Sequence, residues 1–172
     1  WEVPQGSRSS RGKPIVNFWP LEENERVTAV LPVKNFDENL FVFMATAFGT
    51  VKKTSLSKFA RPMKKGIIAA ALDDGDKLIG VTITDGTQDI MLFSTAGKAV
   101  RFSESHVRPM GRGSRGVRGM ILESSQKVVS MISVPITKDS SQNFDSQTVF
   151  IATQNGFGKR TTLREFTRHS RG

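Results

Sequence analysis

Short apolar runs separated by turn-forming residues dominate the pattern of the chain. The first part contains four such runs, at residues 15–18, 26–33, 40–45 and 50–54, each rich in Val, Ile, Phe or Thr. β-branched and aromatic residues in runs of this length are typical of strands, and the runs are too short for a buried helix. We therefore predict four strands here, the same plan in the following parts, and no long helix.

Internal repetition is the strongest feature of the sequence. Three segments align on Gly49, Gly97 and Gly156, with a cation four residues after each glycine and a large apolar residue ten residues after it. Each unit restarts at a basic residue followed by glycine, at spacings of 54, 50 and 56 residues. A period near 50 residues with four strands is typical of propeller blades. The aligned cations are Lys53, Arg101 and Arg160, and the aligned apolar residues are Phe59, Val107 and Phe166.

The predicted fold class is therefore all-β, a β-propeller of four-stranded blades with about three complete blades in one repeat domain. An antiparallel sandwich whose repeats arise from generic strand and turn composition is the alternative. Gly49, Gly97 and Gly156 are predicted to lie between the third and fourth strands, where a positive φ favours glycine. The three blades are predicted at residues 11–60, 65–108 and 115–167, and the third carries a polar loop at 137–147. Residues 1–10 are predicted to hold the last strand of a preceding blade and a linker, and residues 171–172 the start of the next blade.

The charge of the chain is segregated as well as positive. Lys and Arg number 25 against 16 Asp and Glu, a formal net charge of +9. Segments 8–13, 52–65, 98–118 and 159–172 hold 20 of these basic residues and only two of the acidic ones. Recurrence of this kind indicates a repeated surface feature that faces a polyanion.

If the blades stack around a wheel, their fourth strands and junctions lie at equivalent places on its rim and form a curved positive track for phosphates. We predict that the aligned cations hold consecutive stretches of one bent duplex. Protection of exposed strand edges by Lys and Arg is the simpler interpretation. The predicted DNA-binding residues are Arg8, Arg11, Lys13, Lys52, Lys53, Arg61, Lys64, Lys65, Arg101, Arg108, Arg112, Arg115, Arg118, Lys159, Arg160, Arg168 and Arg171.

Catalytic and metal-binding patterns are nearly absent. The chain has no Cys and no Tyr, and its two histidines lie among basic residues without a partner at a catalytic spacing. Residues 111–116 read G-x-G-x-x-G but precede a predicted strand, and the acidic turn at 73–76 lacks the glutamate of a calcium loop. We therefore predict no catalytic residue, metal or cofactor. The lack of Cys fits a reducing cytosol, and the longest apolar runs fall far short of the roughly 20 residues that cross a bilayer.

Several consecutive residues per unit resemble the blade repeats of the C-terminal domains of DNA gyrase A subunits. The segments are 42–47, 116–119 and 151–161, and the similarity extends over the whole chain. The resemblance implies a β-pinwheel that wraps duplex DNA around its basic rim and presents it for strand passage. The basic box of that family, Q-R-R-G-G-K-G, is not found in the sequence, and 111–116 resembles it only in part.

The resemblance also implies a parent enzyme, an ATP-dependent topoisomerase that introduces negative supercoils. Its ATP and Mg, its catalytic tyrosine, the rest of the gyrase A subunit, and the gyrase B subunit would lie outside this chain. The implied setting is the bacterial cytoplasm, at the nucleoid and not in a membrane. The first residue is Trp1, so we expect a fragment. The open alternatives are the corresponding domain of topoisomerase IV and a protein-interaction propeller with an acidic partner.

Overall fold

Three antiparallel β-hairpins form where the apolar runs flank the repeated glycines. The computed structural model describes residues 3–23, 25–63, 65–136 and 144–171. In each hairpin, a strand rich in apolar residues is followed by a short turn and then by a more polar strand. The hairpins are β1 (Phe41–Thr46) with β2 (Thr50–Ser55), β4 (Asp89–Ser94) with β5 (Ala99–Ser103), and β8 (Thr148–Ala152) with β9 (Gly158–Thr162).

Further strands extend the first two hairpins into sheets. β3 (Leu78–Thr84) pairs with β1, and β7 (Val128–Val134) pairs with β4 in the same way. β6 (Val117–Arg118) joins the other edge of β2. The described residues thus form sheet A, in the order β3-β1-β2-β6, sheet B, in the order β5-β4-β7, and sheet C, with β8 and β9. The predicted all-β class is confirmed, although only sheet A has four strands within the described residues.

The predicted units do not coincide with the sheets. Sheet A takes its hairpin from the predicted unit 11–60, β3 from 65–108 and β6 from 115–167. The expectation of four strands within one contiguous unit was wrong, because each inner strand pairs with the hairpin that precedes it in the sequence. Residues 26–33 were predicted as a strand, but they follow no hairpin among the described residues and form no strand. Residues 3–10 likewise contain no strand, and most of the predicted polar loop, residues 137–143, lies outside the described ranges.

A one-turn 3₁₀ helix follows the second strand of every hairpin. The helices of the described residues are all short 3₁₀ turns, and none could span a membrane. Residues 15–18, predicted as a strand, form one of these turns instead. The turns are η1 (Ile15–Asn17), η2 (Leu56–Phe59), η3 (Glu104–His106) and η4 (Leu163–Glu165).

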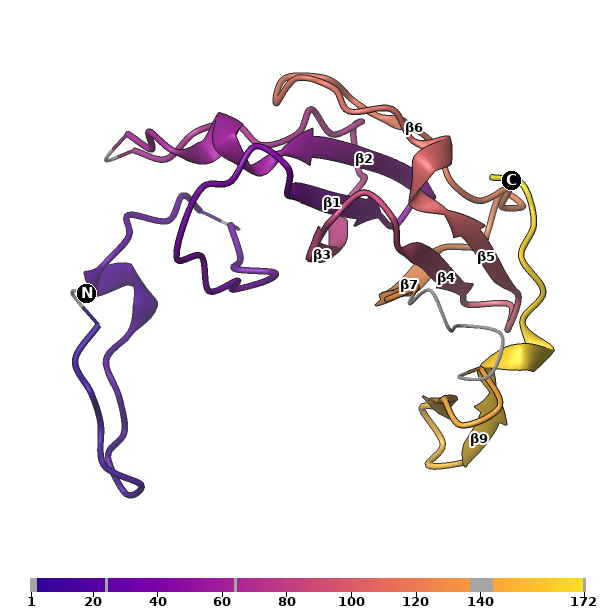
Figure 1. Ribbon diagram of the computed structural model, residues 1–172. Coiled ribbons are helices and arrows are strands. Elements are labelled where there is room, and N and C mark those ends of the chain that lie inside the picture. Colours follow the sequence, from indigo (N-terminus) through magenta and orange to yellow (C-terminus); the bar gives the residue numbers. More distant parts are fainter. Residues whose placement is uncertain (1–2, 24, 64, 137–143, 172) are drawn as a thin grey trace.

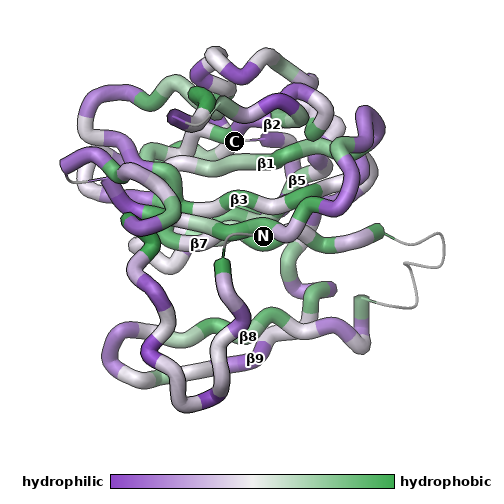
Figure 2. The backbone as a smooth tube through the Cα atoms, turned by 90° about the vertical axis from the view of Figure 1, so that its left-hand side faces the viewer, coloured by the Kyte–Doolittle hydropathy of each residue, from purple (hydrophilic) through white to green (hydrophobic). Residues whose placement is uncertain are grey.

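The three sheets follow one another along a curved body (Figure 1). β3 and β7 lie on its concave side, whereas β6 lies on its convex side. Apolar residues of successive sheets share a core: Phe43 of sheet A packs in one buried cluster with Ile90 and Leu92 of sheet B. Met91 of sheet B packs in another cluster with residues of sheet C. Figure 2 shows the apolar residues concentrated along the central strands and the hydrophilic residues in the loops.

The repeated glycines occupy the hairpin turns with positive φ, as expected: 86° at Gly49, 73° at Gly97 and 81° at Gly156. A β-carbon on Gly49 would lie 2.8 Å from the carbonyl oxygen of Met120, whereas one on Gly97 would meet nothing within 4 Å. Gly97→Ala is therefore expected to cost about 1 to 2 kcal/mol, the cost of a left-handed alanine. Gly49→Ala should cost more, because the backbone at Met120 must also move. Urea unfolding of both variants measures the difference, and equal losses would contradict it.

Candidate nucleic-acid interface

The junction segment 108–118 forms the convex edge of sheet A. The backbone N–H of Met110 donates to the carbonyl of Lys53 at 2.8 Å, and β6 continues the pairing along β2. The same contact recurs at sheet B with the next junction segment, residues 167–171. There the backbone N–H of His169 donates to the carbonyl of Arg101, also at 2.8 Å. Both junction segments therefore lie on the outer edges of successive sheets (Figure 1).

Six arginines of these two segments make up what we call the outer track. The side chain of Arg171 donates to the carbonyl of Arg118 at 2.8 Å, so the segments meet. Arg115 forms an ion pair with Asp73 at 2.6 Å, which still leaves its side chain largely exposed. The outer track consists of Arg108, Arg115, Arg118 and Arg168, which are exposed, and Arg112 and Arg171, which are partly buried.

Three predicted DNA-binding residues are buried, and their assignment to the rim was wrong. Lys52 donates from Nζ to the carbonyl of Ala69 at 2.7 Å and also to the carbonyl of Arg112. Burial lowers the pKa of Lys52, and the neighbouring charge of Arg112 lowers it further. Lys53 and Arg101 are also buried, each against the following sheet. None of the three can reach a phosphate without leaving its carbonyl or carboxylate partners.

Lys53 of sheet A is directed at η3 of the following repeat. Its Nζ donates to the carbonyl of Glu104 at 3.0 Å and lies 3.7 Å from the carboxylate of the same residue. The carboxylate of Glu104 also accepts from the hydroxyl of Thr84 at 2.7 Å. Burial lowers the pKa of Lys53, and Glu104 opposes that shift only in part. Lys53 is thus a link between sheets.

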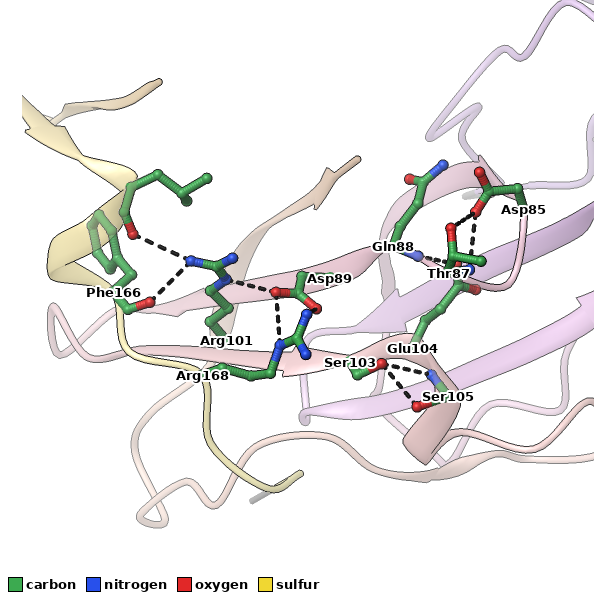
Figure 3. A network of polar contacts seen from close by, with 11 residues as sticks. Asp85, Thr87, Gln88, Asp89, Arg101, Ser103, Glu104, Ser105, Phe166 and Arg168 are labelled. Atoms are coloured by element: carbon green, nitrogen blue, oxygen red, sulfur yellow. Dashed lines mark hydrogen bonds and ion pairs between the residues drawn. The ribbon is translucent and has the colours of Figure 1, made fainter. Parts of the chain in front are cut away.

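Arg101 makes the corresponding contacts to sheet C (Figure 3). Its Nε donates to Asp89 at 2.8 Å, and its Nη1 donates to the carbonyls of Leu163 at 3.3 Å and Phe166 at 3.2 Å. Asp89 is fully buried and also pairs with Arg168, 2.7 Å from the Nη2 of that residue. Asp89 therefore ties a buried cation to an arginine of the outer track.

Asp89 and Glu104, the two buried carboxylates that hold this arrangement, were not among the predicted site residues. A signal existed for Glu104, which is the single acidic residue in the basic segment 98–118. Asp89 carries no comparable signal, because acidic residues also occur in the turns nearby.

The other predicted cations lie apart from the outer track. Lys159 and Arg160 are exposed on β9 at the far end of the sheets. Lys64 falls outside the described residues. The remaining residues are exposed on segments without strands: Arg8, Arg11, Lys13, Arg61 and Lys65.

Comparison with known proteins fits this repeat architecture. A model of the DNA gyrase C-terminal domain, beta-propeller, matches residues 1–34, 41–85, 88–135 and 147–172. The A subunit of DNA gyrase from Salmonella typhimurium is 52% identical over 99% of the chain, and that from Escherichia coli is 50% identical. The chain spans only 18% of the length of each of these two proteins.

Two solved structures share the fold. The C-terminal domain of a DNA topoisomerase IV superposes with a TM-score of 0.83 at 28% identity and covers 93% of the chain. A DNA gyrase A C-terminal domain superposes with a TM-score of 0.78 at 24% identity and covers 95%. The chain covers 47% and 51% of these two structures, respectively. The family model matches most of the residues, and the chain therefore belongs to the DNA gyrase C-terminal domain family of β-propellers.

Proposed function

We propose that the outer track binds the phosphate backbone of duplex DNA without sequence preference and bends the duplex along the convex side. The observation that carries this proposal is the placement of six arginines on the outermost segments of two successive sheets. Arginine pairs well with phosphate, and contacts to phosphates position a duplex without reading its bases. The described residues contain no helix longer than four residues, and hence none that could enter a major groove.

The curved arrangement of the sheets fits bending as well as binding. Bending 20 to 30 base pairs by 40 to 90° costs on the order of 1 to 6 kcal/mol, so contacts on more than one sheet must act together. Arg108, Arg112, Arg115 and Arg118 lie along sheet A, while Arg168 and Arg171 lie along sheet B. A duplex that follows both groups must follow the curve of the body.

Within a gyrase-like parent, this role corresponds to wrapping DNA and presenting it for strand passage during negative supercoiling. The chain itself would be non-catalytic and would need no cofactor, while ATP hydrolysis and DNA cleavage would belong to the gyrase B subunit or to other parts of the A subunit. Its bacterial relatives support a location at the nucleoid in the cytoplasm. A topoisomerase IV parent is the second candidate because of the TM-score of 0.83, but the identity of 52% to a gyrase protein favours gyrase.

The triple variant Arg112→Gln, Arg115→Gln, Arg118→Gln tests the outer track. If six to ten phosphates are contacted, the affinity of the native chain should fall by roughly 10³ to 10⁵ between 50 and 200 mM salt. The variant should lower the slope of log affinity against log salt by about three, one for each lost phosphate contact. It should also reduce energy transfer between the ends of a short labelled duplex.

A charge-matched control separates a local contact from a general effect of net charge. Lys34, Lys77 and Lys127 are exposed and lie outside the junction segments, so Lys→Gln at all three removes the same charge. This control should change the salt slope by less than one. Equal effects of the two triple variants, or a strong preference of the native chain for one base sequence, would overturn the proposal.

A further inference from the structure

Residues 111–116 form a loop that leaves and rejoins the outer edge of β2, on the convex side of the body (Figure 1). The backbone of Met110 donates to Lys53 just before the loop, and β6 begins to pair at Val51 just after it. The loop therefore spans the one β2 residue between these contacts, Lys52. Three of its six residues are glycine, which has more conformational freedom to lose than any other residue. A fixed shape for this loop must come from contacts outside it.

Lys52 of β2 supplies such a contact. It is 2% exposed, and its Nζ donates both to the carbonyl of Arg112 in the loop and to the carbonyl of Ala69 at 2.7 Å. Among the described residues, no carboxylate pairs with Lys52, whereas Lys53 and Arg101 each have such a partner. The Lys52 ammonium thus holds two backbone segments, and one of them is the loop.

Two other contacts of the loop are weaker. The N–H of Ala71 donates to the carbonyl of Ser114 at 3.4 Å, which is long for a hydrogen bond. The ion pair of Arg115 with Asp73 joins side chains that are 74% and 49% exposed, and exposed ion pairs contribute little to stability. Hydrogen bonds from a charged donor are stronger than those between neutral groups. The buried ammonium of Lys52 is therefore the strongest of these three restraints on the loop.

The equivalent residue of sheet B shows that the hairpin itself does not require a lysine at this position. Val100 directly precedes the aligned cation of its hairpin, as Lys52 does in sheet A, and the two residues lie opposite Leu92 and Met44, respectively. Val100 packs against the core that sheets A and B share. Burial of a charge costs free energy that an apolar side chain avoids. The lysine of sheet A therefore serves the segments that it holds and not the hairpin.

We propose that Lys52 is a positioning residue of the outer track, which holds the loop in the shape that lets Arg112 and Arg115 contact one duplex. This inference rests on the proposed function of the outer track. Lys52 itself touches no phosphate, because its ammonium stays on the two carbonyls. A loop that is already ordered binds more tightly than a mobile one, since binding does not have to order it. Loss of Lys52 thus weakens DNA binding without removing a phosphate contact.

The first arm of the test measures the loop without DNA. Lys52→Val introduces the side chain found in sheet B, and the control Lys34→Val removes the same charge at an exposed position outside the junction segments. Amide hydrogen exchange at Ser114 and Ala71, followed by NMR, should accelerate by about tenfold or more in Lys52→Val and stay unchanged in Lys34→Val. Exchange in β4 and β5 should stay slow in both variants, which shows that the fold is intact.

The second arm measures affinity for a short duplex over a range of salt concentrations. Lys52→Val should bind about tenfold more weakly than Lys34→Val at each concentration, because the loop must now be ordered on binding. The slope of log affinity against log salt should be the same for both variants, because the arginines still reach the same phosphates. Failure of the native chain to bind DNA would refute the proposed function, whereas the first arm tests the hold of Lys52 on the loop by itself.

Three outcomes would overturn the proposal. Unchanged exchange at Ser114 and Ala71 would mean that Lys52 does not hold the loop. Faster exchange with the affinity of Lys34→Val would mean that the shape of the loop does not matter for DNA. A salt slope about one lower than that of Lys34→Val would mean that Lys52 contacts a phosphate directly.

A second variant applies if Lys52→Val opens sheet A itself, seen as fast exchange in β1. Lys52→Met then takes its place, because its side chain has nearly the same length but no donor. Fast exchange in β1 for both variants would also overturn the proposal, since Lys52 would then stabilise the sheet and not the loop.

Discussion

Arg101→Ala is expected to lower the free energy of unfolding by about 3 kcal/mol or more. The substitution leaves Asp89 fully buried with Arg168 as its remaining ionic partner, and removal of one member of a buried ion pair typically costs about 3 to 5 kcal/mol. It also removes the guanidinium donor from the carbonyl of Phe166 and from that of Leu163, although the latter keeps the backbone N–H of Phe166 as a donor. Urea unfolding measures the loss, and hydrogen exchange should show sheet C opening before sheets A and B.

The matched control for this prediction is Arg160→Ala, at the same position of the third hairpin. Arg160 is exposed, and surface substitutions of this kind usually change stability by less than about 0.5 kcal/mol. If Arg101 instead contacted DNA on an exposed rim, the two alanine variants would have similar stability and similar losses of DNA affinity. Similar stability would therefore contradict the role of Arg101 as a link between sheets B and C.

Phe43→Ala should have an effect of similar size through packing. Phe43 is fully buried in the cluster between sheets A and B, where it meets Ile90 and Leu92. Replacement of a buried Phe by Ala typically costs about 3 to 5 kcal/mol, because apolar contacts are lost and a cavity remains. The thermal and urea midpoints should both fall, and sheets A and B should lose protection together.

Phe150→Ala gives the comparison at the equivalent position of sheet C. This side chain is 68% exposed, so its loss should cost less than about 1 kcal/mol in the native chain. The difference between the two Phe→Ala variants measures the contribution of a neighbouring sheet to the same position of the repeat. Equal costs would mean that Phe43 does not gain its stability from packing against sheet B.

The sequence was sufficient to predict the features that depend on local pattern. The hairpins follow from apolar runs around glycine, and the positive φ of Gly49 follows from its place in a short turn. The all-β class follows from the repeat of short apolar runs. Each of these inferences uses neighbouring residues or a repeat of the same pattern, which a single sequence contains.

Features that depend on long-range pairing could not be predicted in this way. Residues 26–33 have the composition of a strand, but a strand also needs a second strand to pair with. The composition of one segment does not identify that partner. Lys53 and Arg101 were assigned to the surface because they are charged and recur. Their burial depends on Glu104, Asp89 and the carbonyls of the next repeat. Recurrence of a cation indicates a common role, but it does not distinguish a surface role from an internal one.

The late position of β6 in the sequence affects how the protein folds while it is being synthesised. β2 reaches its final pairing only after Val117 and Arg118 have left the ribosome, and by then the complete hairpin of sheet B has been made. Pairing between distant segments slows folding, and an open strand edge meanwhile invites aggregation. Lys52 and Lys53 are on that edge, and charged lysines on an unpaired strand discourage contact with other chains. The lysines buried in the finished protein would thus guard the nascent chain against aggregation.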